Sequence, residues 1–350
     1  MANSNSSSNC AVSVVIPMYN TEEYIGECLT SLVNQTFQDF EIIIADDCST
    51  DNSCVVAQNF SSLFRNRLKL GKLSVNSGYP SIPRNFALAN ARGKYVYFLD
   101  SDDLLSETAL EELYNVAEKF NADVVHVEKY IIFSGDGKDA ELQSFQAGGL
   151  VTEPTLETFD IGERVTGFVQ KKFLWWACNK LFRRQFLCDN KITFPKTTTF
   201  EDFVFAFKCL VAAKNYVRVP FASYYYRIRE DSLSHKASCA VPQFMEDTMN
   251  VVKSTDDFML GKKFFADNPE YRYMLIDFFM QIQLESFAKS IFLSGNNSLG
   301  ELYDFLYKEI FSRTTQEHAA FTSYLFIAMN VFKLYTIQQA NELAKFKANS

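Results

Sequence analysis

The stretch Tyr95-Val-Tyr-Phe-Leu-Asp-Ser-Asp-Asp103 constrains the fold of this chain most strongly. Five apolar or aromatic residues run directly into a group of aspartates. An uninterrupted apolar run of this length is typical of a strand that is buried on both faces, as in a parallel sheet. Ser106 and Glu107 then open a helical pattern. The acids are therefore expected at the carboxyl end of a buried strand, where open α/β sheets bind ligands.

Asp100 and Asp102 are separated by one residue on what should be a tight bend. Two carboxylates in this arrangement suit a hard divalent cation that also binds phosphate. The alternative is that the acids only solvate and cap the entry of the next helix, because aspartate is common before helices. The rest of the chain is needed to decide between these interpretations.

Strand and helix patterns alternate through the first 133 residues. Strands are expected at 12–17, 41–45, 72–75, 95–99 and from 123 onward, with amphipathic helices between them. This alternation predicts βαβ units and an α/β fold with a mostly parallel central sheet flanked by helices. Residues 134–150 are interpreted as an excursion or a loop, and the pattern is mixed from 160 to 220.

Polar residues follow each of the first four strands, namely Asn20, Asp46 with Asp47, Asn76, and Asp100 with Asp102. Because the carboxyl ends of parallel strands meet at one edge, these residues should form a nucleotide-sized site. Asn20 is also expected to cap the helix that follows, with Glu23 three residues on. The chain has no Gly-x-Gly-x-x-Gly and no P-loop, so a dinucleotide dehydrogenase and a Walker ATPase are disfavoured. A bound phosphate would then need a metal as its counter-charge.

Composition disfavours several other classes of protein. The net charge of −8 argues against a nucleic-acid partner. No stretch of about 18 apolar residues is present, so no membrane span is expected. The eight cysteines are scattered without Cys-x-x-Cys spacing, which fits free thiols in a reducing cytoplasm. We therefore expect a cytoplasmic protein, with peripheral contact at the inner face of the membrane as an extension of that interpretation.

The second half carries polar residues beside aromatic ones. Trp175 and Trp176 could stack on a sugar, but core packing explains them equally well. Glu201 and Asp202 open a helix rich in phenylalanine. The helix dipole favours the ionised form of Asp202, whereas the apolar surroundings disfavour charge. The alternative interpretation of Asp202 is a helix N-cap.

These features together resemble glycosyltransferase family 2, whose members have the GT-A fold, including bacterial capsule and lipooligosaccharide sugar transferases. The resemblance rests on Val14-Val-Ile-Pro-Met-Tyr-Asn20, Asp46-Asp-Cys-Ser-Thr-Asp-Asn-Ser53, Asn76 to Asn85, Phe98-Leu-Asp-Ser-Asp-Asp103, Asn179-Lys-Leu181, Glu201-Asp202, and Tyr226 to His235. One such match would be weak, but the whole set in the family's order is highly specific. The chain departs from the family at Cys48, where a glycine is usual.

The resemblance implies a role for each matched residue. Asp47 would bind the nucleotide base, Arg84 would lie beside that base, and Asp100 would lie near the ribose. Further residues of the donor site would be Pro17, Tyr19, Asn20, Ser101, Arg227 and Arg229, the last two as phosphate ligands or, alternatively, as ion pairs at the sheet edge.

The catalytic and metal-binding residues are implied in the same way. Asp202 would be the catalytic base, with Glu201 as a supporting acceptor contact. Asp102 would bind the divalent metal, Mn²⁺ or Mg²⁺. His235 would complete the metal shell, as in some relatives, or else be an ordinary loop residue.

The implied activity is an inverting, metal-dependent transfer of a hexose or N-acetylhexosamine from a UDP-sugar. The acceptor would be the hydroxyl of a glycan or lipid-linked molecule in surface polysaccharide biosynthesis. A nucleotidyltransferase is one alternative, but it should carry a Gly-rich basic loop after the first strand, which Met18-Tyr-Asn20 is not. An inactive sugar-nucleotide binding module is another, and it should lack Asp102 or Asp202, which are both present.

The expected domain layout has three parts. Residues 1–10 should be a disordered tail, because they are Asn/Ser-rich and lack the pattern of a signal peptide. Residues 11–239 should form the GT-A catalytic domain, with a nucleotide-binding half at 11–133 and an acceptor half at 134–239. Residues 240–350 should be a helical region whose apolar stripes pack helices together. Membrane-surface contact or a homo-oligomer through these helices is the alternative.

Overall fold

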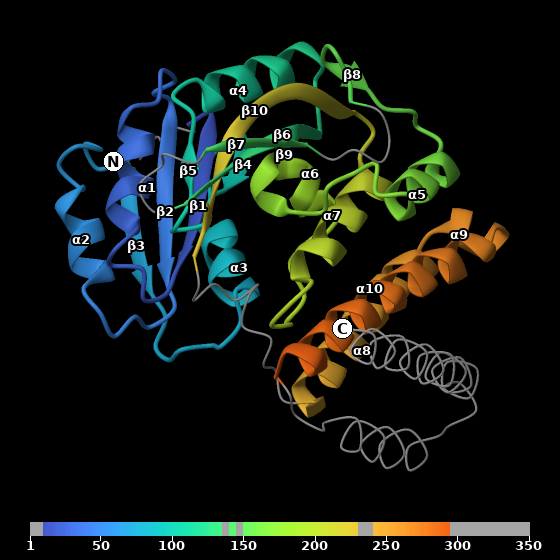
Figure 1. Cartoon of the computed structure of the whole chain (residues 1–350). Helices are drawn as coiled ribbons and strands as arrows, with labels where there is room; N and C mark the ends of the chain where they lie inside the picture. Colours follow the sequence, from blue (N-terminus) through green and yellow to red (C-terminus); the bar gives the residue numbers. More distant parts are fainter. Residues whose placement is uncertain (1–9, 135–139, 145–149, 230–240, 295–350) are drawn as a thin grey trace, which may run out of the picture. The chain divides into compact units, whose positions relative to one another are not determined.

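The computed structural model describes residues 10–134, 140–144, 150–229 and 241–294 (Figure 1). The chain divides into two compact units. The first comprises Met1–Glu230 with Asn250–Leu275, and the second comprises Asp231–Met249 with Ile276–Ser350. The central sheet belongs to the first unit.

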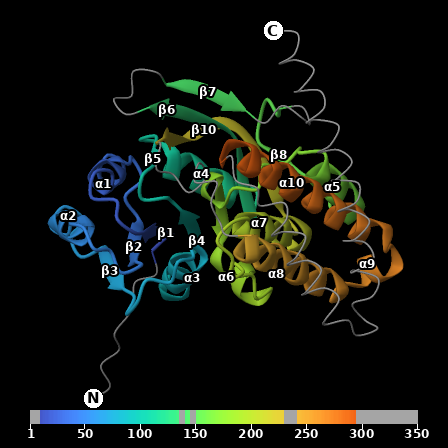
Figure 2. The ribbon, with the colours of Figure 1, turned by 60° about the horizontal axis from the view of Figure 1, so that its bottom comes forward.

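The described strands form one ten-stranded sheet whose main path runs β3-β2-β1-β4-β9-β6-β10-β5. The strands are β1 Val12–Met18, β2 Phe40–Asp46, β3 Leu68–Lys72, β4 Tyr95–Phe98, β5 Leu104–Leu105, β6 Val124–Ser134, β7 Glu141–Ser144, β8 Thr155–Leu156, β9 Lys180–Arg183 and β10 Tyr216–Ile228. Strands β1 to β4 are mutually parallel, and β9 runs antiparallel between β4 and β6. Figure 2 shows β6, β7 and β10 side by side, in agreement with their pairing.

Helices flank this sheet on both faces. The described helices are α1 Ile25–Val33, α2 Ser53–Asn59, α3 Ser81–Asn90, α4 Ala109–Lys119, α5 Ile161–Val169, the 3₁₀ helix η1 Ala177–Asn179, α6 Arg184–Asp189, α7 Glu201–Ala212, α8 Val241–Leu260, α9 Lys263–Asp267 and α10 Glu270–Ser294. The predicted α/β class with a helical C-terminal region is thus confirmed as far as residue 294. Residues 295–350 of the predicted helical region lie outside the described part. Among the described helices, none is long and apolar enough to cross a membrane.

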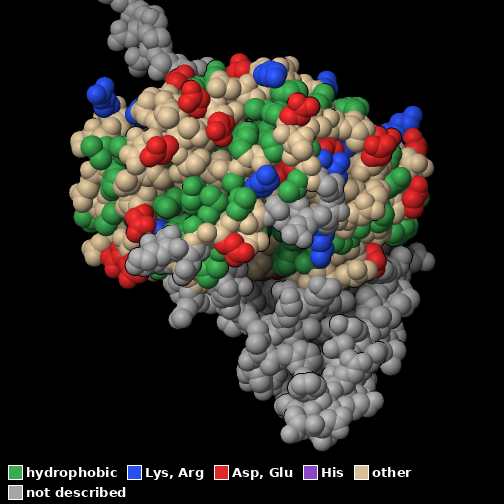
Figure 3. Space-filling model, turned by 45° about the horizontal axis from the view of Figure 1, so that its top comes forward, with side chains coloured by type: hydrophobic (Ala, Val, Ile, Leu, Met, Phe, Trp, Pro, Cys, Tyr) green, Lys and Arg blue, Asp and Glu red, His purple; other side chains and the backbone are tan. Residues whose placement is uncertain are grey.

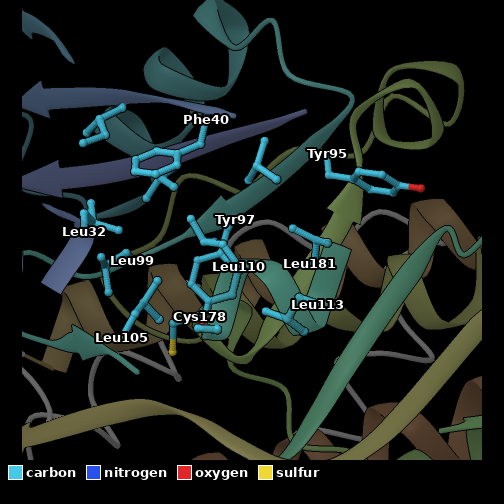
Figure 4. Close-up of a cluster of buried hydrophobic side chains, with 14 of the residues drawn as sticks. Leu32, Phe40, Tyr95, Tyr97, Leu99, Leu105, Leu110, Leu113, Cys178 and Leu181 are labelled. Atoms are coloured by element: carbon cyan, nitrogen blue, oxygen red, sulfur yellow. The ribbon is translucent and has the colours of Figure 1, made fainter. Parts of the chain in front are cut away.

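Strand β4 is buried on both faces, as its apolar run predicts. On one face Tyr97 lies beside Leu110 and Cys178 within a cluster of buried hydrophobic side chains (Figure 4). On the other face the ring of Phe98 makes edge contacts with Phe182 and Phe205, at centroid distances of 5.8 and 5.6 Å. Because both faces bury aromatic area, β4 is a fixed platform for the aspartates that follow it.

Two predictions of strand and loop were wrong. The third strand lies at 68–72 and not at 72–75, because Leu68 and Leu70 pair with β2 and pack against its core face. Val75, which the earlier register would have placed in that strand, is 68% exposed. Part of the predicted loop at 134–150 is strand β7, which pairs antiparallel with β6.

Asn20 does not cap α1, so that prediction was also wrong. The helix begins at Ile25 with Tyr24 in the cap position, and Asn20 has a left-handed backbone with φ of 49°. The Oδ1 atom of Asn20 accepts a hydrogen bond from the Thr50 amide at 2.8 Å. Asn20 therefore joins the end of β1 to the loop after β2.

Candidate active site

The loops after the first three strands meet at one edge of the sheet, as predicted. Asp47 is buried, and its carboxylate accepts hydrogen bonds from the amide and the hydroxyl of Ser77, at 2.9 and 2.8 Å. The Asn76 side chain donates to the Asp47 carbonyl at 3.1 Å. These bonds connect the β2 end to the segment after β3 and fix the carboxylate at which the nucleotide base is expected.

Cys48 adopts the backbone conformation that the usual glycine would explain. Its φ is 66°, in the left-handed region that side chains with a Cβ atom rarely enter. The buried Asp46 carboxylate accepts the Ser49 amide at 3.1 Å and holds the turn from within. Cys48 therefore takes up a left-handed conformation to which a glycine is better suited.

Arg84 on α3 joins acids from two distant parts of the chain. Its Nη2 atom binds Asp100 Oδ1 at 2.8 Å, and its Nη1 atom binds Glu201 Oε1 at 2.6 Å. The same Nη1 lies 3.5 Å from Asp202 Oδ1. The structure thus brings together Asp100 from the end of β4 and the Glu-Asp pair of α7 around one buried guanidinium. The described ion pairs of Arg84 are with these acids, whereas the resemblance had placed this arginine beside the nucleotide base.

Burial disfavours the charged form of the two α7 carboxyl groups that lie beside this guanidinium. Burial raises the pKa of Glu201 to about 7, although Arg84 lowers it. Burial also raises the pKa of Asp202, but Arg84 and a hydrogen bond from the Ala177 amide at 3.0 Å oppose that shift. Two neighbouring acids whose environments differ in this way can separate the proton-holding and proton-accepting roles. The pKa of Glu201 is about 7, whereas Arg84 and the Ala177 amide both favour the ionised form of Asp202.

The entry of α7 is built on a strained residue. Phe200 has φ of 61° and ψ of 14°, a left-handed conformation that is rare for a bulky side chain. Residues held in such regions cost about 1–3 kcal/mol and cluster at functional sites. The helix begins at the next residue, so Glu201 and Asp202 occupy its first turn, where the macrodipole favours negative charge.

The last acid of the β4 stretch, Asp103, has a structural environment. It is buried, the Tyr224 hydroxyl donates to one of its oxygens, and the Arg227 amide donates to the other at 2.7 Å. Asp103 thereby attaches β10 to the loop after β4. The resemblance assigned no role to this residue.

Asp102 faces the two arginines predicted to bind phosphate. Arg229 Nε lies 2.8 Å from Asp102 Oδ2. Arg227 Nε donates to the Asp102 carbonyl at 2.9 Å, and its Nη2 binds Glu27 at 2.6 Å. The Arg227 side chain is only 3% exposed, so its contacts fit the ion-pair interpretation, whereas Arg229 lies directly at the Asp-x-Asp motif.

The acids offer a partial site for a divalent cation. Burial and the neighbouring charge of Asp100 raise the pKa of Asp102, so positive charge placed there would be stabilised. Among the described residues no group of three or more His, Cys, Asp and Glu is arranged to hold a metal. His235 lies outside the described residues. Carboxylate oxygens suit Mn²⁺ or Mg²⁺, which often take their remaining ligands from phosphate and water. The residues present therefore fit a cation bound together with a diphosphate.

The two tryptophans have different surroundings. Trp175 contacts Phe203 of α7 at a centroid distance of 5.9 Å. The Trp176 ring stacks on Tyr226 of β10 at 5.5 Å and meets the edge of Tyr130 of β6 at 4.9 Å. Both indoles are half-buried, and both pack against protein rings. Core packing thus accounts for these contacts.

The remaining predicted donor residues lie near the end of β1 or in the Asp-x-Asp motif. Pro17 is half-buried within β1, and Tyr19 is 47% exposed just beyond it. Ser101 is buried between the two acids. Figure 3 shows acidic side chains and single basic ones interspersed on one face of the molecule, in keeping with the net charge of −8.

Three features of the site were missed from the sequence. The Ala177 amide is a backbone donor, which no side-chain pattern reveals. The strained conformation of Phe200 has no sequence signal either. Lys180 belongs to the matched Asn-Lys pair, but nothing in that pattern indicated that the lysine would be buried beneath the site.

Comparison with known proteins identifies a family that this chain matches. A family model described as Glycosyl transferase family 2 matches residues 13–189. The poly(ribitol-phosphate) beta-glucosyltransferase of Bacillus spizizenii is 34% identical over 253 residues, which are 70% of this chain and 37% of that protein. The poly(ribitol-phosphate) beta-N-acetylglucosaminyltransferase TarP of Staphylococcus aureus is 32% identical over 232 residues, or 65% of each chain. The chain therefore spans between about a third and two thirds of the length of these curated relatives.

Solved structures agree in fold. The structure of S. aureus TarS 1–349 in complex with UDP-GlcNAc has a TM-score of 0.59 and 25% identity, covering 92% of this chain and 80% of that one. The mannosyltransferase PcManGT of Pyrobaculum calidifontis, in complex with GDP-Man and Mn²⁺, has a TM-score of 0.50 at 15% identity, covering 95% of this chain and 85% of that one. The second likeness concerns the fold alone.

Proposed function

Because the chain belongs to glycosyltransferase family 2, we propose that it is a metal-dependent, inverting sugar transferase. The donor is a UDP-activated hexose or N-acetylhexosamine, and the acceptor is a hydroxyl group of a surface polymer of the polyol-phosphate class. The observation that carries the proposal is the Arg84 guanidinium, which joins the donor-side acid Asp100 to the acid pair of α7.

The choice of donor and acceptor class is supported by the relatives. Two of them are named as transferring glucose or N-acetylglucosamine to poly(ribitol-phosphate). A structural neighbour was solved with UDP-GlcNAc bound. Asp47, held by Ser77, is suited to receive the N–H group of a uracil base because its carboxylate is already oriented.

Asp202 acts as the general base. An inverting transfer needs a group that takes the proton of the acceptor hydroxyl as that oxygen attacks the anomeric carbon. The Asp202 side chain is 19% exposed, compared with 10% for Glu201, so Asp202 is the more accessible of the two. Glu201 keeps its proton more readily and holds Arg84 in place.

Asp102 would hold the divalent cation, and that cation would neutralise charge on the departing diphosphate. Arg229 lies next to Asp102 and can add a charge-assisted hydrogen bond to a phosphate oxygen. Arg84 thus connects Asp100, the acid on the nucleotide side, to the proposed base Asp202.

A turnover screen tests this function. UDP-glucose, UDP-N-acetylglucosamine and GDP-mannose are each supplied with Mn²⁺, Mg²⁺ or EDTA, with and without poly(ribitol-phosphate), and UDP or GDP release is measured. We expect turnover only with a UDP-sugar and a metal, increased by the polymer. Asp102→Asn should abolish it while the circular dichroism spectrum is unchanged. Undiminished turnover in EDTA would show that no metal is required. Absence of turnover with all of these donors would contradict the proposed substrate class.

A further inference from the structure

Lys180 is a buried lysine that the proposed transfer chemistry does not use. It lies at the start of β9 and is 1% exposed. Its Nζ atom donates hydrogen bonds to the Leu174 carbonyl, to the Trp176 carbonyl at 2.7 Å and to the Asn179 side chain at 2.8 Å. The three donors of an ammonium group are matched by three acceptors, all from the segment just before the lysine.

The same segment is also fixed to the sheet. The Asn179 side chain donates to the Val127 carbonyl of β6 at 2.9 Å. Asn179 therefore connects β6 to Lys180, and Lys180 gathers the carbonyls of the loop that precedes it. A buried charged group whose donors are all bound fixes the local geometry, because each lost hydrogen bond would leave a desolvated polar atom.

This loop contributes a contact to the proposed base. Ala177 follows the two residues whose carbonyls Lys180 binds and precedes Asn179. Its amide donates to Asp202 Oδ2 at 3.0 Å. The other described contact of the Asp202 carboxylate is Arg84 Nη1 at 3.5 Å, which is longer. The position of the Ala177 amide thus determines where one oxygen of Asp202 lies.

We propose that Lys180 is a positioning residue, which holds the segment Leu174–Asn179 so that the Ala177 amide orients the Asp202 carboxylate for proton transfer. The proposal rests on the proposed role of Asp202 as base. Lys180 itself contacts neither donor nor acceptor, so it acts through the loop.

The charges around Asp202 and Lys180 indicate what the loss of Lys180 would do. Asp202 faces Arg84 of α3, Asp100 beyond β4, Glu201 in its own helix, and Lys180. Lys180 faces Asp202, Cys178 and Cys209 of α7, and its charge also acts on His126 of β6. Burial lowers the pKa of Lys180 to about 7, and below that pH its positive charge lowers the pKa of Asp202. Without this lysine, Asp202 should hold its proton at higher pH.

The first test is Lys180→Met, which keeps the length of the side chain and removes its charge and donors. Hydrogen exchange of peptides covering 174–179 reports whether the loop is released, without reference to activity. We expect faster exchange there, a kcat lower by about 10–100-fold, and an acid limb of the kcat–pH profile displaced to higher pH. Affinity for UDP, measured by calorimetry with Mn²⁺, should change by less than about threefold, because the nucleotide residues are untouched.

Lys172→Met is the matched control. Lys172 lies in the same region and pairs with Glu157 at 2.7 Å, but it has no described bond to the loop. Its loss should leave both the exchange of 174–179 and the acid limb unchanged. Equal effects of the two substitutions would reduce Lys180 to a general stabilising residue and overturn the proposal.

Ala177→Pro removes the orienting amide directly. Trp176 is extended, with φ of −62° and ψ of 134°, and Ala177 is the first residue of η1, so both positions accept the change. The acid limb should again move to higher pH, and adding Lys180→Met should then cost less than about threefold more. This variant also provides the test if Lys180→Met fails to fold.

The outcomes separate this proposal from the function on which it rests. If Asp202→Asn keeps normal transfer, the assignment of the base fails, and the exchange data still show whether Lys180 orders the loop. If Asp202→Asn is inactive but neither Lys180→Met nor Ala177→Pro moves the acid limb, the function stands and the positioning role is wrong.

Discussion

Arg84 connects two acids that both follow it in the sequence, one 16 and the other 117 residues further on. Its side chain is 9% exposed, so the pairs it makes are poorly screened by water. Removing one partner of such a buried pair leaves an uncompensated charge. Substitutions of the acids around Arg84 should therefore have different effects on rate and binding, depending on the chemical role of each acid.

Substitution of the two acids of α7 separates binding from chemistry. Asp202→Asn keeps the size of the side chain but cannot take a proton, so the transfer rate should fall by roughly 10²–10⁴-fold. Donor affinity should be nearly unchanged, because the groups proposed to hold the donor are Asp47, Asp100 and a metal at Asp102, and none of them is altered. Initial rates and calorimetric UDP binding, compared with Glu201→Gln, provide the measurement.

Glu201→Gln should reduce the rate less, because the amide can still bind Arg84. Near-normal transfer by Asp202→Asn with an inactive Glu201→Gln would show that the base is Glu201. If both variants remain active, the pair is only a helix entry.

The raised pKa of Glu201 also predicts how stability depends on pH. Its pKa is about 7 when folded, compared with 4.5 ordinarily. A group whose pKa is raised by folding adds stability below its unfolded pKa, and this contribution is lost as pH rises through the folded value. The wild type should therefore lose of the order of 1–3 kcal/mol between pH 4.5 and pH 7.5 relative to Glu201→Gln. Urea denaturation of both proteins at the two pH values measures the difference, and parallel curves would contradict it.

At the scale of elements, predictability follows burial. Strands β1, β2 and β4 were predicted nearly to the residue because they are buried on both faces and read as apolar runs. Strand β3 was misplaced because it is an edge strand of mostly half-buried residues. Its alternation of apolar and polar residues continues beyond Lys72, so the pattern does not mark where the strand ends. Strand β7 depends on pairing with β6, which a local pattern does not reveal.

The same reasoning applies to the candidate site. Asp100, Asp102 and Asp202 could be located because a strand end and a helix start have sequence signatures. The Ala177 amide, the carbonyls around Lys180 and the backbone angle of Phe200 depend on contacts between distant segments, for which the sequence carries no local signal. The contacts of Arg84 were unexpected for the same reason.

The attachment of β10 to the Asp-x-Asp loop can be tested with one hydroxyl. Tyr224→Phe removes the hydrogen bond to the buried Asp103 and leaves a desolvated carboxylate oxygen. This should cost about 1–3 kcal/mol of unfolding free energy, measured by urea denaturation. Tyr225→Phe, at a half-buried neighbour, is the control and should change it by less than about 0.5 kcal/mol. Equal costs for the two would show that the Asp103 bond does not stabilise the loop.

At the scale of the whole molecule, the unit that contains the sheet also includes residues 250–275. The rings of Phe207 in α7 and Phe258 in α8 lie 6.4 Å apart, and Lys208 donates to Ser254 at 2.8 Å. The buried apolar residues of this stretch are Val251, Val252, Met259, Phe265 and Leu275. The C-terminal region is therefore expected to be part of what keeps α7 covered.

Two truncations test this expectation. A fragment ending at residue 240 should expose apolar surface over α7, bind a hydrophobic dye and aggregate. A fragment ending at Leu275 keeps the buried residues and should remain monodisperse in size-exclusion chromatography. A monodisperse, fully active fragment 1–240 would show that the helices are dispensable.

The left-handed backbone of Phe200 bears on how the protein could adapt to heat. Glycine would relieve the strain at this position, so selection for thermal resistance alone should favour it. The same change would give the chain more freedom immediately before Glu201 and Asp202, whose placement the strained turn determines. We therefore expect glycine at this position to change heat resistance and turnover rate in opposite directions.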